Sequence, residues 1–189
     1  MHGKCGLSFG MFGMVMLVAP IDLTRAATVP EPSPPHQDLW EKQADGLERA
    51  KQAIEQCLTP VGERLTPPAQ CIRAASTACE QEHGTSQHGL NDCSAFSYEA
   101  WKARIADTMA SFASARRVDT RLGVKTGEAK RQLVESQRRW RKWNALDCEV
   151  QAKGTEGGSI RPFTKSICLS DHAAARAIDL QRLIGWWLS

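Results

Sequence analysis

The residues of this chain that could do chemistry gather around its cysteines. The segment CEQEHGTSQHGLNDC holds Cys79, His83, His88 and Cys93. Thiolate and imidazole groups at such short spacing could surround a tetrahedral zinc ion. The alternative is that the two cysteines enter disulfides, as thiols usually do in an oxidising compartment. We expect disulfides here, and therefore no metal ion and no other cofactor in the protein.

The number of cysteines favours the same interpretation. One of the seven, Cys5, lies in an N-terminal segment that we expect to be removed. The other six form an even set: Cys57, Cys71, Cys79, Cys93, Cys148 and Cys168. Six cysteines allow fifteen pairings, among which the sequence does not choose. Pairing between neighbours would give 57–71, 79–93 and 148–168, and the first is the safest because the other four cysteines could cross between helices.

No set of residues matches a catalytic motif. His172 lies beside Asp171, but no nucleophile accompanies them in a recognisable pattern. The chain also lacks a phosphate-binding glycine loop, a GxSxG elbow, an HExxH pair and a dinucleotide fingerprint. Neighbouring carboxylates such as Glu80 and Glu82 are equally well explained by solubility. We therefore predict that the protein is not an enzyme.

A basic, tryptophan-containing stretch reads SQRRWRKWNALDC and covers residues 136–148. A nucleic-acid groove would present aromatic and basic groups to the same partner. On a helix with about 100° per residue, the cations instead fall opposite Trp140 and its apolar neighbours. We expect Trp140 and Trp143 to pack inward and the cations to face solvent, which excludes nucleic acid. An interfacial helix on a membrane surface would also separate its faces and stays as an alternative.

The N-terminal residues indicate export. Residues 1–26 combine Lys4, an apolar run and a cleavage site after Ala26 with Thr24 at the −3 position, as in a signal peptide. The apolar run is too short to span a bilayer comfortably, and we expect no stable membrane insertion after cleavage. Residues 27–37 are rich in proline and are predicted to be an extended tether. A periplasmic or secreted location follows.

Hydrophobic spacing predicts helices nearly everywhere else. The expected helices cover residues 38–58, 65–84, 85–122, 128–151 and 166–188, and the glycine-rich residues 153–165 form a loop. The fold class is therefore all-α, a disulfide-braced helical bundle of about four to five helices. The formal charge of +3 falls to +2 without Lys4, Asp22 and Arg25, so whole-molecule charge gives no attraction for a polyanion.

Three segments resemble one known family. SQRRWRKWNALDC, GGS and CLSDHAAARAIDL are similar to the C-terminal motif of the LprI-like lysozyme-inhibitor family, which consists of exported bacterial all-helical domains. The resemblance covers roughly residues 79–185. It implies a helical domain at 79–189 and leaves residues 38–78 as an added N-terminal helical pair. The matching positions with expected core roles are Gln137, Trp140, Arg176 and Leu180.

The chain departs from the family at polar positions. Asn144 and Ala145 stand where the family has Arg-Asp, and Lys102, Ala106 and Met109 stand where it has Asp, Asn and Tyr. Since apolar positions persist while polar ones differ, the resemblance implies the fold more strongly than the activity.

The resemblance implies an exported binding protein whose partner is a lysozyme or another peptidoglycan hydrolase. A plausible mechanism is obstruction of the sugar-binding cleft by residues 154–161, with a disulfide between Cys148 and Cys168 fixing the conformation. The candidate contact residues are Gly157, Gly158, Ser159 and Arg161. The simpler interpretation is that this loop is only a connector. Alternatives of another class are an envelope structural or assembly factor and an immunity protein against a peptidoglycan-degrading toxin.

Overall fold

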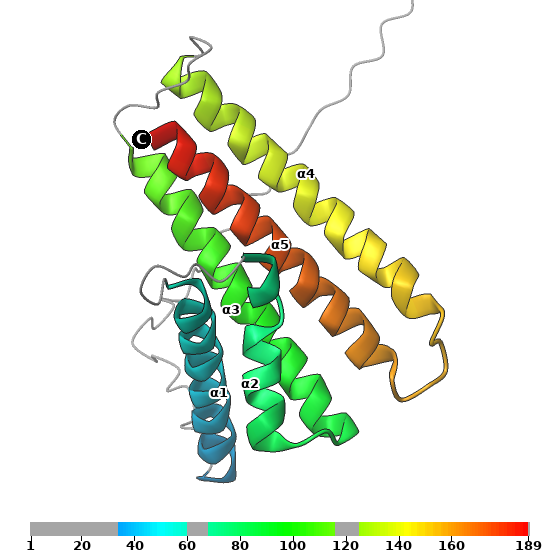
Figure 1. Ribbon diagram of the computed structural model, residues 1–189. Coiled ribbons are helices and arrows are strands. Elements are labelled where there is room, and N and C mark those ends of the chain that lie inside the picture. Colours follow the sequence, from blue (N-terminus) through cyan, green and yellow to red (C-terminus); the bar gives the residue numbers. More distant parts are fainter. Residues whose placement is uncertain (1–33, 60–67, 116–124, 189) are drawn as a thin grey trace, which may run out of the picture. The chain divides into compact units, whose positions relative to one another are not determined.

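A computed structural model describes residues 34–59, 68–115 and 125–188, and within these ranges it contains helices and no strand. In chain order the helices are α1 (Pro34–Leu58), the 3-10 helix η1 (Pro68–Cys71), α2 (Ala74–His83), α3 (Gln87–Ser114), α4 (Thr126–Lys153) and α5 (Arg161–Leu188) (Figure 1). The all-α prediction is confirmed. The expected signal peptide and Cys5 lie outside the described residues.

Helix α5 is the centre of the arrangement. Helices α3 and α4 both pack on α5, which lies between them, while α1 and α2 pack on each other and on α3 (Figure 1). Ala173, Ala174 and Ala177 of α5 are completely buried, and their small side chains allow neighbouring helices to approach closely. Large side chains of α3, chiefly Trp101 and Phe112, fill the remaining core.

A glycine lets α1 approach α3. A Cβ atom placed on Gly46 would lie 2.5 Å from the Phe96 ring, which is closer than real contacts allow. Next to this crossing, Ala50 and Ile54 of α1 are buried in the common core. The absence of a side chain at Gly46 therefore sets how near the two helices lie.

Three disulfides join successive elements. Cys57–Cys71 links the end of α1 to η1, Cys79–Cys93 links α2 to α3, and Cys148–Cys168 links α4 to α5. Pairing between neighbours, one of the arrangements that the sequence left open, is therefore the observed one. The zinc alternative is wrong, because the sulfurs of Cys79 and Cys93 are bonded to each other.

Several predicted boundaries differ from the structure. Among its described residues, the predicted helix 65–84 is divided into η1 and α2, and the predicted helix 85–122 ends at Ser114. Helix α1 begins at Pro34, inside the segment 27–37 that was predicted as a tether, because a proline in the first turn lacks only an N–H that has no helical partner there. Helix α5 begins at Arg161, so the predicted loop 153–165 shrinks to residues 154–160. Pro162 is accommodated in the first turn of α5 for the same reason. Within the described ranges no helix is both long and apolar enough to cross a membrane.

Candidate binding site at the tip of the α4–α5 hairpin

The loop between α4 and α5, residues 154–160, is called the tip below. Its backbone forms successive tight turns, in which the N–H groups of Thr155 and Gly158 each donate to a carbonyl three residues earlier at 3.1 Å. Gly157 adopts φ +82°, a left-handed conformation that costs little only for glycine. All tip residues except the half-buried Thr155 are exposed. The tip is thus an internally hydrogen-bonded and accessible surface.

The base of the tip is held by one disulfide and one carboxylate. Cys148 and Cys168 are both buried and join the two helices just below the tip. Glu149 of α4 accepts hydrogen bonds from two cations of α5, Arg161 and, at 2.5 Å, Lys165. The hydrogen bond from Lys165, together with the charges of both cations, lowers the pKa of Glu149, so this carboxylate is ionised at neutral pH. These contacts fix the distance between the two ends of the tip.

Further from the tip, polar side chains also link α4 to α5. Arg176 donates from Nε to the Gln137 side-chain oxygen at 2.9 Å and from Nη2 to the Ser136 hydroxyl at 3.1 Å. His172 Nδ1 lies 2.9 Å from the Asn144 side-chain oxygen. Gln137 and Asn144 are both buried, so these hydrogen bonds replace water that the two amides have lost.

The four residues expected in the core differ in how deeply they are buried. Leu180 is completely buried, Gln137 is buried, and Arg176 is half-buried above Gln137. Trp140 is only partly buried and packs against the edge of the core.

The prediction that Trp143 packs inward is wrong. This side chain is 51% exposed and its ring stacks on His172, with centroids 4.9 Å apart. Leu146 and Val150 are exposed on the same side of α4 and were not singled out in the sequence. Trp143, Leu146 and Val150 are called the α4 stripe below. The prediction from helical spacing failed for Trp143 because α4 packs mainly against α5, so the side of α4 that faces the core is narrower than the apolar side expected from the sequence.

A groove of about 520 Å³ lies between α3 and α4. Residues at which the chain departs from the resembling family line it together, from α3 (Lys102, Ala106 and Met109) and from α4 (Asn144 and Ala145). The sequence could not predict that these positions meet, because α3 and α4 are brought together mainly by packing on α5.

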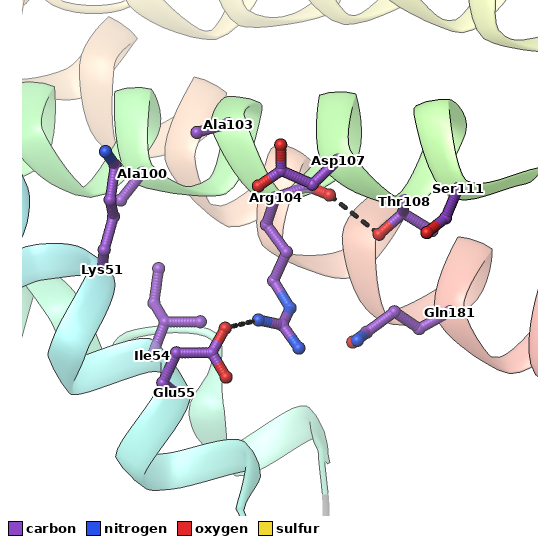
Figure 2. Close-up of a pocket in the computed structure, with 10 residues that line it drawn as sticks. All are labelled: Lys51, Ile54, Glu55, Ala100, Ala103, Arg104, Asp107, Thr108, Ser111 and Gln181. Carbon is purple, nitrogen blue, oxygen red and sulfur yellow. Dashed lines mark hydrogen bonds and ion pairs between the residues drawn. The ribbon is translucent and has the colours of Figure 1, made fainter. Parts of the chain in front are cut away.

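A second pocket, of about 410 Å³, lies between α1, α3 and α5 (Figure 2). Arg104 of α3 reaches across it to Glu55 of α1, and the Thr108 hydroxyl donates to the Arg104 carbonyl at 2.8 Å. The charges of Arg104 and Glu55 compensate each other. We therefore interpret this ion pair as a structural link between α1 and α3.

The predicted contact residues therefore divide into two groups. Gly157, Gly158 and Ser159 lie together on the exposed tip, whereas Arg161 belongs to α5 and its guanidinium is bound to Glu149. Glu149 and Lys165 were not identified from the sequence. Their pairing follows once Cys148 and Cys168 are joined, since each lies on the tip side of one of those cysteines.

Comparison with known proteins gives one match. Residues 79–180 match the family model described as "Lysozyme inhibitor LprI". No curated protein and no solved structure matches the chain. The matched residues include α3, α4, the tip and most of α5.

Proposed function

The chain belongs to the LprI lysozyme inhibitor family, and from this we propose that it is an exported, non-enzymatic inhibitor that blocks the substrate cleft of a lysozyme with its tip. The observation that carries the proposal is the exposed tip between two helices that a disulfide joins at its base. The family supplies the class of partner, and the tip supplies a surface of suitable size and order.

Export is supported by the cysteines. All six cysteines of the described residues are paired, and disulfides form and persist in oxidising compartments such as the periplasm or the extracellular space. Lysozyme substrates lie in the same compartments. The N-terminal sequence of residues 1–26 agrees with this location as a predicted signal peptide.

Obstruction is supported by the order of the tip. A glycosidase cleft contains two carboxylic side chains on either side of the bond to be cleaved, and the cleft must admit a sugar chain between them. The Ser159 hydroxyl and the backbone N–H groups of a narrow loop can donate to such carboxylates. Since the internal hydrogen bonds and the disulfide already hold the loop, little conformational entropy is lost on binding.

The experiment measures muramidase activity against increasing concentrations of the oxidised, signal-free protein. We expect inhibition of at least one lysozyme at micromolar concentration. If several lysozymes from different sources stay fully active under these conditions, lysozyme inhibition is the wrong function.

Two tryptophan substitutions test the role of the tip. Ser159→Trp places a bulky group on the exposed tip, and Ser114→Trp places the same group at the exposed C-terminal end of α3, far along the helices from the tip (Figure 1). We expect Ser159→Trp to weaken inhibition by roughly tenfold or more, as loss of a central interface contact does. Equal inhibition by the two variants would show that another surface contacts the enzyme.

A further inference from the structure

The outward side of α4 combines exposed apolar side chains with an excess of basic over acidic side chains, and we propose that this side docks on an anionic lipid surface. The apolar part is the α4 stripe, whose members Trp143, Leu146 and Val150 are 51%, 70% and 68% exposed. Their spacing of three and four residues places them on one side of the helix. The proposal does not depend on lysozyme inhibition.

The stripe faces solvent because α4 packs against α5 with its other side. The residues of α4 that are most buried, among them Leu133, Asn144 and Cys148, all lie toward α5 and the core. The stacking of Trp143 on His172 holds the indole ring in place at one edge of the stripe. A fixed tryptophan beside two aliphatic side chains is typical of helices that lie in the interfacial region of a bilayer.

The cations next to the stripe supply the attraction for an anionic surface. Arg138 and Arg139 both bind Glu135, so these three groups together keep one positive charge. Among the described residues, Lys142 lies at the flank of the stripe beside Trp143 and has no carboxylate partner. Arg141 has none either, but it lines the groove between α3 and α4 on the side of the helix opposite the stripe. Basic side chains with free charge next to an apolar patch are the arrangement by which peripheral proteins bind anionic lipids.

The composition of the surface favours lipid over other partners. A second copy of the chain would bring the same cations together, and their repulsion opposes such a dimer. A nucleic acid would stack its bases on aromatic rings, whereas two of the three side chains of the α4 stripe are aliphatic. An acyl and headgroup boundary accepts indole, leucine and valine alike.

The test uses the oxidised, signal-free protein and vesicles of phosphatidylcholine with or without phosphatidylglycerol. We expect binding by co-sedimentation to the vesicles that contain phosphatidylglycerol, and a binding constant that falls as salt is added. Vesicle binding should also change the tryptophan fluorescence of the protein, and this change should be largely lost in Trp143→Phe. Binding that is absent or equal for the two kinds of vesicle would overturn the proposal.

Matched substitutions on α4 show whether vesicle binding requires the α4 stripe itself or any exposed apolar side chain. Leu146→Gln combined with Val150→Gln should reduce vesicle binding by roughly tenfold. The control is Val134→Gln, since Val134 is 58% exposed on the side of α4 opposite Trp143 and should leave binding unchanged.

Lys142→Gln should weaken binding and reduce its dependence on salt, whereas Arg141→Gln, on the side of α4 opposite the stripe, should change neither. An equal loss in Val134→Gln, a concentration-dependent dimer, or preferential binding of the purified protein to nucleic acid would each contradict the proposal. Circular dichroism of every variant confirms that the helices are retained.

Discussion

At the scale of single residues, the Arg176 guanidinium is one of the groups that hold α4 to α5. The Gln137 amide is 5% exposed, and its side-chain oxygen accepts from Arg176 Nε. Burial lowers the pKa of Arg176, because it disfavours the charged form. The guanidinium nevertheless stays charged at physiological pH, so a charged donor serves a buried neutral amide.

Arg176→Ala should destabilise the protein by about 1–3 kcal/mol, because it leaves the Gln137 oxygen buried without its donor. The measurement is the free energy of unfolding in urea. Arg182→Ala is the matched control, since Arg182 is exposed on the same helix and should change stability by less than about 0.5 kcal/mol. Equal effects of the two substitutions would mean that the hydrogen bond to Gln137 contributes nothing.

A second residue-scale prediction concerns acid. The hydrogen bonds from Arg138 and then Arg139 lower the pKa of Glu135 from 4.5 to about 2. A carboxyl with a lowered folded-state pKa stabilises the fold fully above its unfolded value, and this contribution is lost as the pH falls toward 2. Wild type should therefore unfold at higher urea than Glu135→Gln near pH 6, by a small margin because the group is exposed. The margin should vanish near pH 2, and a constant margin would contradict the assignment.

Residue-scale features were predictable only in part. The resembling motif points to Gln137, Arg176 and Leu180 as core positions, and helical spacing points to Gln137 and Leu180 as well. The prediction failed for Trp143, because the hydrophobic spacing of a helix does not show how many other helices pack against it. The contact between Asn144 and His172 was not predicted, because it links side chains of two different helices.

At the scale of elements, the closeness of α1 to α3 is set by Gly46. Glycine in the middle of a helix ordinarily costs stability relative to alanine. Here a side chain would overlap the Phe96 ring, so the general preference for alanine is reversed. The chain gives up some helix propensity in α1 in exchange for a close crossing.

Gly46→Ala should therefore destabilise the protein by about 1–3 kcal/mol, the usual range for overpacking a core. Gly185→Ala supplies the opposite expectation, because a Cβ atom at this exposed position of α5 would meet nothing within 4 Å. That substitution should stabilise by about 0.5–1 kcal/mol. Thermal or urea unfolding measures both, and the idea fails if the two changes have the same sign.

Helices themselves were the most predictable elements. The order and approximate extent of α3, α4 and α5 follow from hydrophobic spacing, and pairing of neighbouring cysteines was among the alternatives that the sequence allowed. The predicted start of α5 at residue 166 lies too far along the chain, because the glycines and Pro162 of residues 153–165 indicate a loop. Pro162 in fact falls in the first turn, the one part of a helix that accepts it.

At the scale of the whole molecule, the disulfides join α1 to η1, α2 to α3 and α4 to α5, so each bridge links two elements that follow each other in the chain. Each bridge closes a short stretch of chain and restricts the unfolded state, by about 2–4 kcal/mol in typical cases. Stability therefore depends on the redox compartment. This dependence agrees with the proposal that the protein is exported.

The oxidised, signal-free protein should contain no reactive thiol. Alkylation under denaturing conditions without reductant, followed by mass spectrometry, should add no label, whereas reduction should expose six sites and lower the melting temperature. Labelling of Cys79 or Cys93 without reductant would contradict the observed pairing. Reduction that leaves the melting temperature unchanged would show that the bridges do not stabilise the fold.

The disulfide between Cys148 and Cys168 also has a consequence for how the molecule can change. This disulfide joins α4 to α5 between the tip and the rest of the helical bundle, so it holds the two ends of residues 154–160 together whatever the sequence of the tip. Substitutions and insertions there affect a surface loop whose ends remain fixed, and such changes cost little stability. A library that randomises the tip alone should keep the fold in most members, so this scaffold is suited to acquiring new binding partners by evolution in one loop.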